Sequence, residues 1–186
     1  MTSPHDTGDR PASRPAEALE CERRLDPLAA AYHRFADTVI PSGARPWLRG
    51  EWLGHALHPA LTDLPIGFWT SSWLLDLGGG RRGRRAAQAF AGLGVLAAVP
   101  TIATGATEYL GLDDERKRRV GVVHALVNAT ATFCYLRSWQ ARRRGHHLVG
   151  VGWGQVGAAV ATVGGYLGGH LAFGSSPAGP GERHTG

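Results

Sequence analysis

The sequence predicts an all-α integral membrane protein, in which four antiparallel transmembrane helices form a bundle and an amphipathic N-terminal helix lies in the membrane interface. Two observations lead to this prediction. First, four long apolar runs follow one another along the chain, and the last three contain no Asp, Glu, Lys or Arg. Second, short polar segments with clustered arginines separate the runs, as is typical of membrane-flanking loops. The runs cover residues 61–77, 86–107, 120–136 and 148–173.

The lengths of these runs suit a bilayer, whose core of about 30 Å requires roughly 17–25 mostly apolar residues per helix. The second and fourth runs reach this length easily, and the third reaches its lower limit. The first run is the weakest, because Asp63 and Asp76 must then lie near opposite membrane interfaces. A soluble four-helix bundle is the alternative, but a soluble helix needs a charged face, and residues 148–173 have none.

The chain divides into a membrane domain and polar flanks. Residues 58–173 form the predicted four-span domain, and residues 21–57 contain the interfacial helix and the lead-in to the first span. Residues 1–20 and 174–186 are predicted to be disordered tails, because few of their residues are apolar. No signal peptide is expected, since residues 1–20 contain no apolar stretch, and the first span would then serve as an uncleaved anchor.

The lead-in contains the amphipathic helix. Its apolar residues recur at spacings of three and four, which places them on one helix face, and Pro41 and Gly43 end the helix. We expect this face to lie in the membrane interface, with Trp47 and Trp52 at the level of the headgroups. Packing on a partner is the alternative. The residues of this face are Leu25, Leu28, Tyr32, Phe35 and Val39.

Capping and turn residues indicate where the spans begin and end. Pro59 suits the first helical position of the first span, which leaves His58 just outside the helix. The three glycines at 78–80 end this span, and the sequence RRGRR at 81–85 forms the next loop. One of the two aspartates at 113–114 is expected to cap the third span.

The distribution of basic residues predicts the membrane orientation. Eight arginines, in the segments 81–85 and 137–144, lie on one side of the spans, against six basic residues on the other side. The positive-inside rule therefore places the first set in the cytoplasm, so that both termini of this multi-pass cell-membrane protein face outward. The net charge of +5 does not indicate nucleic acid, because no basic stripe with interleaved aromatic residues is present.

Small and polar residues mark the predicted interior face of the fourth span. A ridge of small residues four apart allows the backbones of two helices to approach closely in lipid. The adjacent row of polar residues is expected to face the interior of the bundle as well. The ridge consists of Gly157, Ala161, Gly165 and Gly169, and the polar row of Gln155, Thr162, Tyr166 and His170.

Ionisable residues gather near one end of the four spans, which predicts one polar site in one leaflet. Such residues are uncommon inside membranes and indicate a functional site by default. His55 lies one helical turn before the first of them. Hydrogen bonds from Thr104, Asn128 and Tyr166 are predicted to support the site. The ionisable residues, one for each run, are His58, Glu108, His124 and His170.

The remaining charged residues near the spans have separate predicted roles. Asp76 is expected to pair with Arg81, with Arg82 or with a basic residue after the third span. Asp63 either joins the polar site or caps the first span. His146 and His147 are expected to be solvated or to contact lipid headgroups.

Several separated motifs resemble an uncharacterised bacterial family of four-span membrane proteins, domain of unknown function 2231. Residues 54–69 contain the family's G-H-x-x-H-P motif and, after a short run, its F/L-P-I-G motif. Residues 121–128 (GVVHALVN) and 168–173 (GGHLAF) match as well. Residues 104–109 (TGATEY) are similar to the family's G-x-T-D-W/Y, except that Glu108 replaces the usual aspartate and so carries the charge on a longer arm.

The resemblance covers roughly residues 25–173 and implies a four-span fold without an established activity. Some relatives continue into a Rieske iron–sulfur domain, which links the family to redox chemistry. This sequence contains no Cys-x-His or Cys-x-x-His pair, so no Rieske cluster is expected here. Its two cysteines, Cys21 and Cys134, also lack the spacing of a metal site.

Three functions remain open for the polar site, and the first is a haem b or other redox centre that serves a membrane redox partner. Two neutral imidazoles on different helices can clamp one haem inside a four-helix bundle. His124 and His170 are the best pair for this role. His58 is the main alternative to them, and His55 is a further candidate for the same cofactor.

The second function is a transition-metal site or a proton or ion pathway, formed by His58, Glu108, His124 and His170. A mixture of histidine and carboxylate suits zinc or iron. The third is structural: hydrogen bonds between helices, which contribute about 0.6 kcal/mol each on average, fix the bundle of a scaffold or partner subunit. A conventional enzyme is not expected, because no nucleophile–base motif or phosphate-binding loop is present. The predicted partner is the lipid bilayer, and the oligomeric state stays open.

Overall fold

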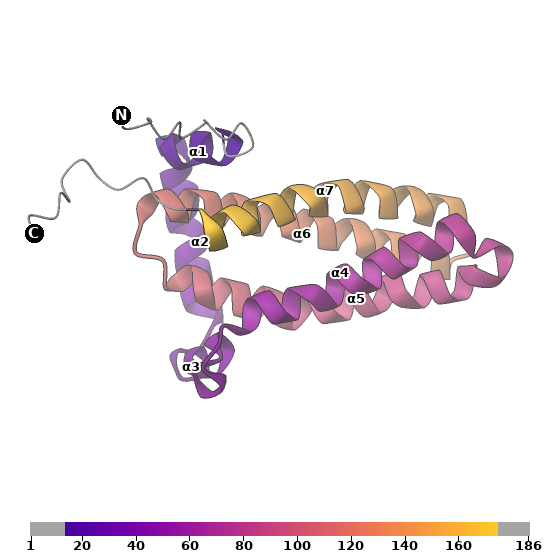
Figure 1. Cartoon of the computed structure of the whole chain (residues 1–186), viewed down its shortest axis with the longest axis horizontal. Coiled ribbons are helices and arrows are strands. Elements are labelled where there is room, and N and C mark those ends of the chain that lie inside the picture. Colours follow the sequence, from indigo (N-terminus) through magenta and orange to yellow (C-terminus); the bar gives the residue numbers. More distant parts are fainter. Residues whose placement is uncertain (1–13, 175–186) are drawn as a thin grey trace, which may run out of the picture.

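The computed structural model describes residues 14–174, and within this range all regular structure is helical, as the sequence predicts. Figure 1 shows the long helices lying side by side and the short helices grouped at one end of them. The long helices are α4 (Leu57–Gly78), α5 (Gly80–Leu110), α6 (Glu115–Arg143) and α7 (His147–Phe173). The short ones are α1 (Arg14–Cys21), α2 (Asp26–Val39) and α3 (Arg45–Arg49), with single 3-10 turns at Arg23–Leu25, Ser42–Ala44 and Glu51–Leu53.

The long helices pack mainly as two pairs. α4 packs most extensively on α5, and α6 on α7, while contacts between α5 and α6 join the two pairs. An aromatic contact in the middle links three helices. The rings of Trp69 in α4 and Tyr135 in α6 stack with their centroids 4.1 Å apart, and Ala98 of α5 completes this core cluster.

The turn between α4 and α5 is built from glycines, as the sequence predicts. The N–H of Gly79 donates to the carbonyl of Leu75 at 2.9 Å, and Gly80 has a φ of +51°. A Cβ at Gly79 would lie 2.6 Å from the Leu75 carbonyl oxygen, so glycine is required at this tight approach. The prediction of a loop at 81–85 is wrong, because the chain has already reversed at Gly80 and these residues form the first turns of α5.

Other helix boundaries lie close to their predicted positions. The side chain of Asp114 accepts a hydrogen bond from the backbone N–H of Arg116 at 2.8 Å, which confirms one of the two predicted caps of α6. α4 begins at Leu57, so His58 lies inside its first turn rather than before it. Pro59 is tolerated as the third residue of the helix, because the N–H groups of the first turn have no helical acceptor.

Helix α1 occupies part of the segment that was predicted to be a disordered tail. Ala16 of α1 is fully buried against Val120 of α6 and Leu167 of α7. This long-range contact stabilises a segment whose own composition is polar. The composition therefore predicted disorder as far as residue 20, although the helix begins at Arg14. The other parts of the predicted tails, residues 1–13 and 175–186, lie outside the described residues.

Helix α2 crosses the ends of the long helices (Figure 1) and packs on them through its small residues. Ala29 and Ala36 are buried against α5 and α6, whereas Leu28, Phe35 and Val39 are 40%, 62% and 54% exposed. The helix therefore uses its small-residue face to pack on its own chain. Most of the predicted apolar face points away from the bundle and is accessible.

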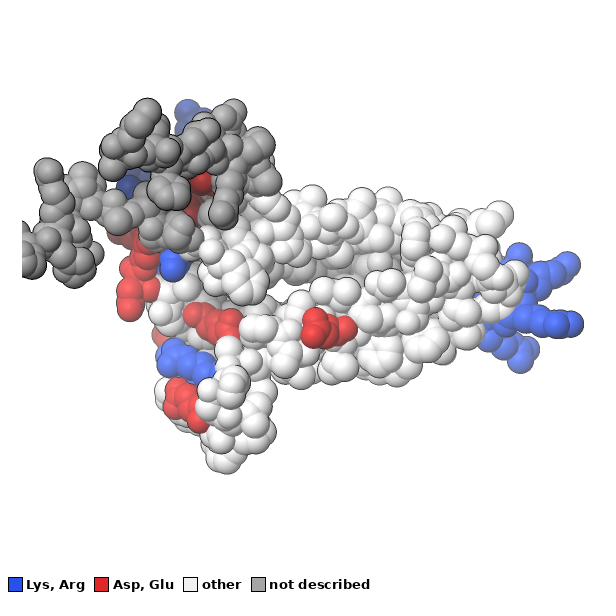
Figure 2. Space-filling model, viewed as in Figure 1, with Lys and Arg blue, Asp and Glu red and all other residues white. Residues whose placement is uncertain are grey.

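Two of the long helices, α5 and α7, are long and apolar enough to cross a membrane. α4 and α6 contain more polar residues and do not meet the same condition. In the apolar stretches of α5 and α7, only 28% and 17% is buried inside the protein, so most of this apolar surface faces outward. Figure 2 shows a largely uncharged surface along the long helices, with charged groups gathered mainly at the two ends.

The face of α7 that packs on α6 differs from the predicted ridge. Gly150, Gly157 and Gly164 are buried, at spacings of seven. A Cβ at Gly165 or Gly169, in contrast, would have no neighbouring atom within 4 Å. A spacing of seven keeps one side of a helix toward its neighbour over several turns, while a spacing of four drifts around the helix. The prediction of the ridge is therefore wrong at Gly165 and Gly169.

The polar row of α7 turns outward as a consequence. Gln155, Thr162 and Tyr166 are exposed, and Gln155 accepts a hydrogen bond from Nε1 of Trp73 in α4 at 3.0 Å. His170, at the end of the row, is only partly exposed. The prediction that the whole row faces the interior is wrong. It assumed that the neighbouring ridge at Gly165 and Gly169 packs on another helix, and that ridge is open.

Candidate functional site

The candidate site lies in the half of the long helices next to the short helices, and each long helix contributes to it. His58 comes from the first turn of α4, and Thr104 and Glu108 come from the last turns of α5. His124 and Asn128 lie one turn apart on α6. Glycines of α5 and α7 provide the backbone surfaces on which these side chains lie.

His58 connects α4 to α5. Its Nδ1 lies 3.0 Å from the carbonyl oxygen of Thr101 and 3.4 Å from Oγ1 of Thr104. A Cβ at Gly105 would lie 2.7 Å from Cε1 of His58, so the imidazole fits only because this position is glycine. A carbonyl can only accept, so Nδ1 carries the proton and Nε2 keeps its lone pair.

His124 connects α6 to α7 in the same manner. Its Nδ1 donates to the carbonyl of Gly164 at 3.0 Å, and its ring lies against Gly168, where a Cβ would be 2.9 Å from Cε1. Asn128, one turn further along α6, donates from Nδ2 to the backbone carbonyl of His124 at 2.9 Å. The same Nδ2 lies 3.3 Å from Nε2 of His124, the ring nitrogen that keeps its lone pair and can accept from it.

The two imidazoles meet between the helix pairs. The ring centroids of His58 and His124 are 6.4 Å apart, and the ring planes are almost perpendicular at 86°. The structure therefore brings together two of the predicted histidines with Thr104 and Asn128. This pairing joins the α4–α5 hairpin to the α6–α7 hairpin at the level of the candidate site.

Glu108 lies beside this pair and is incompletely satisfied. Its Oε1 is buried and has no hydrogen-bond partner among the described residues. The carboxylate is close enough to His58 for an electrostatic interaction. Buried polar atoms rarely lack a hydrogen-bond partner. Among the described residues of the site, Oε1 of Glu108 is the buried side-chain acceptor to which no group donates.

His170 and His55 do not join the pair. Nε2 of His170 lies 2.7 Å from Oε1 of Glu20 in α1, and both side chains are largely buried. His55 is exposed, and its Nδ1 contacts the carbonyl of Leu53 at 3.2 Å. The predicted set of four ligands is therefore divided between two places, because His170 pairs with Glu20 at the end of α7. No pattern in the sequence indicates that Glu20 lies there.

The paired histidines are closely packed. Both imidazoles lie directly on the backbones of neighbouring helices, at Gly105 and Gly168, and their ring centroids are 6.4 Å apart. Within residues 14–174, no group of three or more His, Cys, Asp or Glu side chains is arranged to hold a metal ion. The arrangement instead suits hydrogen bonding between helices.

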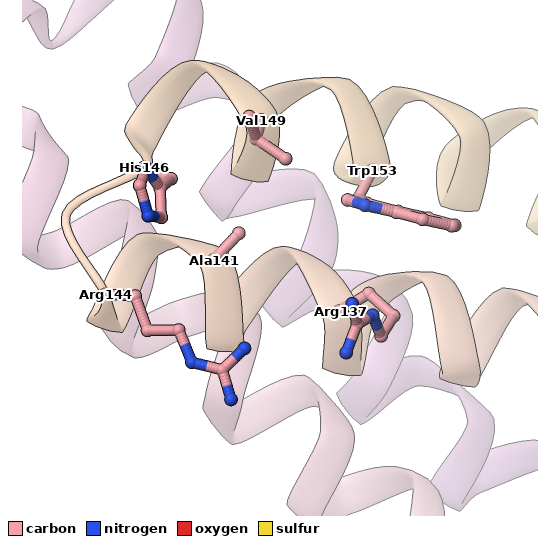
Figure 3. Close-up of a pocket in the computed structure, with 6 residues that line it drawn as sticks. All are labelled: Arg137, Ala141, Arg144, His146, Val149 and Trp153. Atoms are coloured by element: carbon pink, nitrogen blue, oxygen red, sulfur yellow. The ribbon is translucent and has the colours of Figure 1, made fainter.

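The cavities described for the molecule lie at the opposite end of the long helices. Figure 3 shows one of about 320 Å³, lined by Arg137, Ala141 and Arg144 of α6, by His146 of the connecting loop, and by Val149 and Trp153 of α7. A neighbouring cavity of about 370 Å³ is lined by Trp139, Gln140, Arg143 and Arg144. Neither is near the paired histidines.

A second buried polar cluster lies at this opposite end. Arg142 donates from Nη1 and Nη2 to the two carboxylate oxygens of Asp76 at 2.7 and 2.6 Å, and these side chains are 2% and 6% exposed. Nε of Arg142 donates to Ser138, whose hydroxyl donates to the carbonyl of Gly150. The ion pair confirms the prediction that Asp76 meets a basic residue beyond the third apolar run. Ser138 was missed, because a lone serine in a polar segment carries no sequence signal.

The short helices are held by a third polar cluster. Arg119 of α6 donates to both carboxylate oxygens of Asp26 in α2, at 2.6 and 3.1 Å, and to the carbonyl of Glu20 at 2.7 Å. The hydrogen bond from Arg119 holds the pKa of Asp26 below its ordinary value. The sequence analysis missed this contact, because the two residues are 93 positions apart in the chain.

The model of a family described as a predicted membrane protein, DUF2231, matches residues 54–176. No curated protein and no solved structure matches the chain. The matched range includes all four long helices and both paired histidines.

Proposed function

We propose that this chain, which belongs to the DUF2231 family of predicted membrane proteins, is a four-span integral membrane protein that acts as a non-catalytic scaffold or partner subunit. In this proposal, the paired histidines lock the two helix hairpins together. The observation that carries it is that the two imidazoles meet between the hairpins, with ring centroids 6.4 Å apart, while Nδ1 of each bonds a backbone carbonyl within its own hairpin at 3.0 Å.

The apolar surfaces of α5 and α7 support membrane insertion directly, and the internal bonding of α4 and α6 supports their insertion as well. In lipid, polar groups must find partners inside the protein. In α4, Ser72 donates to the carbonyl of Ala87 in α5 at 2.8 Å. In α6, Thr130 and Thr132 each donate to a carbonyl one turn earlier at 2.8 Å. The 22 residues of α4 extend about 33 Å, which matches a bilayer core.

The short connections support an antiparallel order of the spans. One residue separates α4 from α5, and a few residues join the other neighbours, so consecutive helices must return across the same layer. The arginine-rich ends of α5 and α6 would face the cytoplasm by the positive-inside rule. Both termini would then lie outside, with the exposed apolar residues of α2 and the exposed Trp47 and Trp52 at the outer interface.

A spectrum and a metal analysis of the detergent-purified protein, expressed with haem and metals supplied, test the proposed role of the histidines. We expect no Soret band in the oxidised or dithionite-reduced protein and no stoichiometric metal. His58→Ala and His124→Ala should each destabilise the protein by about 1–3 kcal/mol, because the hydrogen bond and the packing of the imidazole between the helices are lost. The control His55→Ala should change nothing, since His55 is exposed and outside the pair.

The opposite result is equally clear. A haem or metal that is retained in His55→Ala and lost in His58→Ala and His124→Ala would overturn the structural role. It would establish a cofactor site and make electron transfer or metal chemistry the leading function.

A second candidate function, a proton pathway, is favoured by one observation, the buried Oε1 of Glu108 without a partner. A carboxylate beside His58 could accept a proton that enters from the outer end of the bundle. In this case, proteoliposomes should conduct protons in response to a pH gradient, and Glu108→Gln should abolish the flux. Equal leakage in wild-type, Glu108→Gln and protein-free vesicles would reject the pathway.

A further inference from the structure

We propose that the arginine-rich end of the α6–α7 hairpin binds the phosphate headgroup of an anionic phospholipid. The site is the cavity of about 320 Å³ that Figure 3 shows between α6 and α7. Its arginines are Arg137 and Arg144, and its apolar wall is formed by Val149 and Trp153. This inference rests on the proposed insertion of the four long helices in a bilayer.

The positive charge at this cavity is not neutralised by the protein. The segments 76–88 and 137–150 contain eight arginines and one acidic residue, Asp76. Asp76 is already bonded to Arg142 through both carboxylate oxygens. Figure 2 shows the resulting end of the molecule with blue groups and no red group on the visible face. The excess positive charge at this end therefore favours the approach of an anion from outside the chain.

The two arginines of the cavity are available for such an anion. Arg137 donates to the amide oxygen of Gln140 at 3.1 Å, which leaves its charge uncompensated. No carboxylate of residues 14–174 forms an ion pair with Arg137 or Arg144. Guanidinium groups bind phosphate oxygens through charge-assisted hydrogen bonds. Arg144 also lines the adjacent cavity of about 370 Å³, so this residue contributes to both cavities.

The apolar part of the cavity favours a lipid over a free phosphate. Val149 is 55% exposed, and Trp153 packs edge-on against Phe133, which is itself 54% exposed on α6. These residues continue from the arginines along the outside of the two helices, where an acyl chain would lie. A basic pocket that opens onto an apolar helix surface is the arrangement in which membrane proteins bind anionic headgroups. Trp153 also suits the interfacial level of a bilayer.

Native mass spectrometry of the full chain in detergent tests this site with two lipids, dioleoyl-phosphatidylglycerol and dioleoyl-phosphatidylcholine. We expect the wild-type chain to retain phosphatidylglycerol and not phosphatidylcholine. Arg137→Gln/Arg144→Gln should weaken phosphatidylglycerol binding by at least about tenfold relative to the control Arg81→Gln/Arg82→Gln. The control removes the same charge from exposed arginines of α5 at the same end, outside the cavity. Circular dichroism verifies that both variants are folded, and the single variant Arg144→Gln replaces the double variant if it is not.

Three results would overturn the inference. Equal losses in the two double variants would mean that net charge alone attracts the lipid. Equal retention of both lipids would remove the role of the anionic headgroup. Displacement of phosphatidylglycerol by millimolar inorganic phosphate would indicate a site for free phosphate instead of a lipid.

Alkaline carbonate extraction of cell membranes separates a failure of this inference from a failure of the proposed function. A chain that is released into the soluble fraction contradicts the membrane insertion on which both depend. A chain that stays in the membrane without a preference for phosphatidylglycerol contradicts only the lipid site.

Discussion

At the scale of single residues, glycines decide where polar side chains can lie between the helices. Gly105 receives the imidazole of His58, Gly168 receives that of His124, and Gly164 lies against the amide of Asn128. Each of these positions faces a neighbouring helix, so the missing Cβ creates the space for a hydrogen bond to the backbone. The polar site is thus built jointly by the residues that bond and by the residues that have no side chain.

This argument makes a prediction for two adjacent glycines of α7. A Cβ at Gly164 would lie 2.6 Å from Oδ1 of Asn128, whereas a Cβ at Gly165 would meet nothing within 4 Å. We expect Gly164→Ala to lower the free energy of unfolding by about 1–3 kcal/mol, because it overpacks the contact with α6. Gly165→Ala should be neutral or slightly stabilising, since alanine favours the helix. Thermal unfolding of the two variants in detergent measures the difference, and equal effects would contradict the assigned face of α7.

The sequence predicted part of this site for a physical reason. Polar residues at the ends of apolar runs must meet one another if the runs lie side by side, and His58, Glu108 and His124 do lie in one region. The sequence did not place His170 correctly, because its partner Glu20 lies in a segment whose polar composition predicted disorder. The face of α7 was also not determined, since several rows of small residues run along this glycine-rich helix.

At the scale of the elements, the short helices are fastened to the ends of the long ones by a few polar contacts. Tyr109 of α5 donates from its hydroxyl to the carbonyl of Ala29 in α2 at 3.0 Å. Arg119 binds Asp26, and His170 binds Glu20. The long helices could be predicted from their apolar runs alone. The docking of α1 and α2 could not, because it depends on pairs of residues far apart in the chain.

The docking of α2 should depend on pH through Asp26. Because Arg119 lowers the pKa of Asp26 in the folded chain, the carboxylate contributes stability above its unfolded pKa of about 3.9 and loses it as the pH falls through the lower folded value. We expect the amide-exchange protection of residues 26–39, corrected for intrinsic rates, to be constant from about pH 7 to pH 5 and to fall below about pH 4.

Two variants of α2 complete this measurement. Asp26→Asn should show weaker protection at neutral pH and little further loss in acid. Asp37→Asn is the matched control on the same helix, because Asp37 pairs with Arg45 within the short helices and does not touch α6. An acid transition that persists unchanged in Asp26→Asn would show that another group controls the docking.

At the scale of the whole molecule, contacts between α4 and α6 recur along the length of the two helices. The pair of Asp76 and Arg142 joins α4 to α6 at the arginine-rich end, and the paired histidines join the same helices nearer to the other end. The stacked rings of Trp69 and Tyr135 lie between them in sequence and also join α4 to α6. Since α4 and α6 belong to different hairpins, these contacts fix the two hairpins against each other. Most charged groups then lie near the ends of the long helices, as a bilayer favours.

The two native cysteines allow the proposed topology to be tested. Cys21 is exposed beside the short helices, and Cys134 is buried in α6. If four helices span the membrane with the arginines inside, a membrane-impermeant maleimide should label Cys21 in right-side-out vesicles and should label neither Cys134 nor the variant Cys21→Ser.

A cysteine at the opposite end completes this test. Arg84 is exposed near the start of α5, so Arg84→Cys in a cysteine-free background should react only after the vesicles are permeabilised. Labelling of Arg84→Cys but not Cys21 in intact vesicles would invert the orientation and keep the four spans. Labelling of both positions from the same side would contradict the spans themselves, because α4 could not then carry the chain across the bilayer between Cys21 and Arg84.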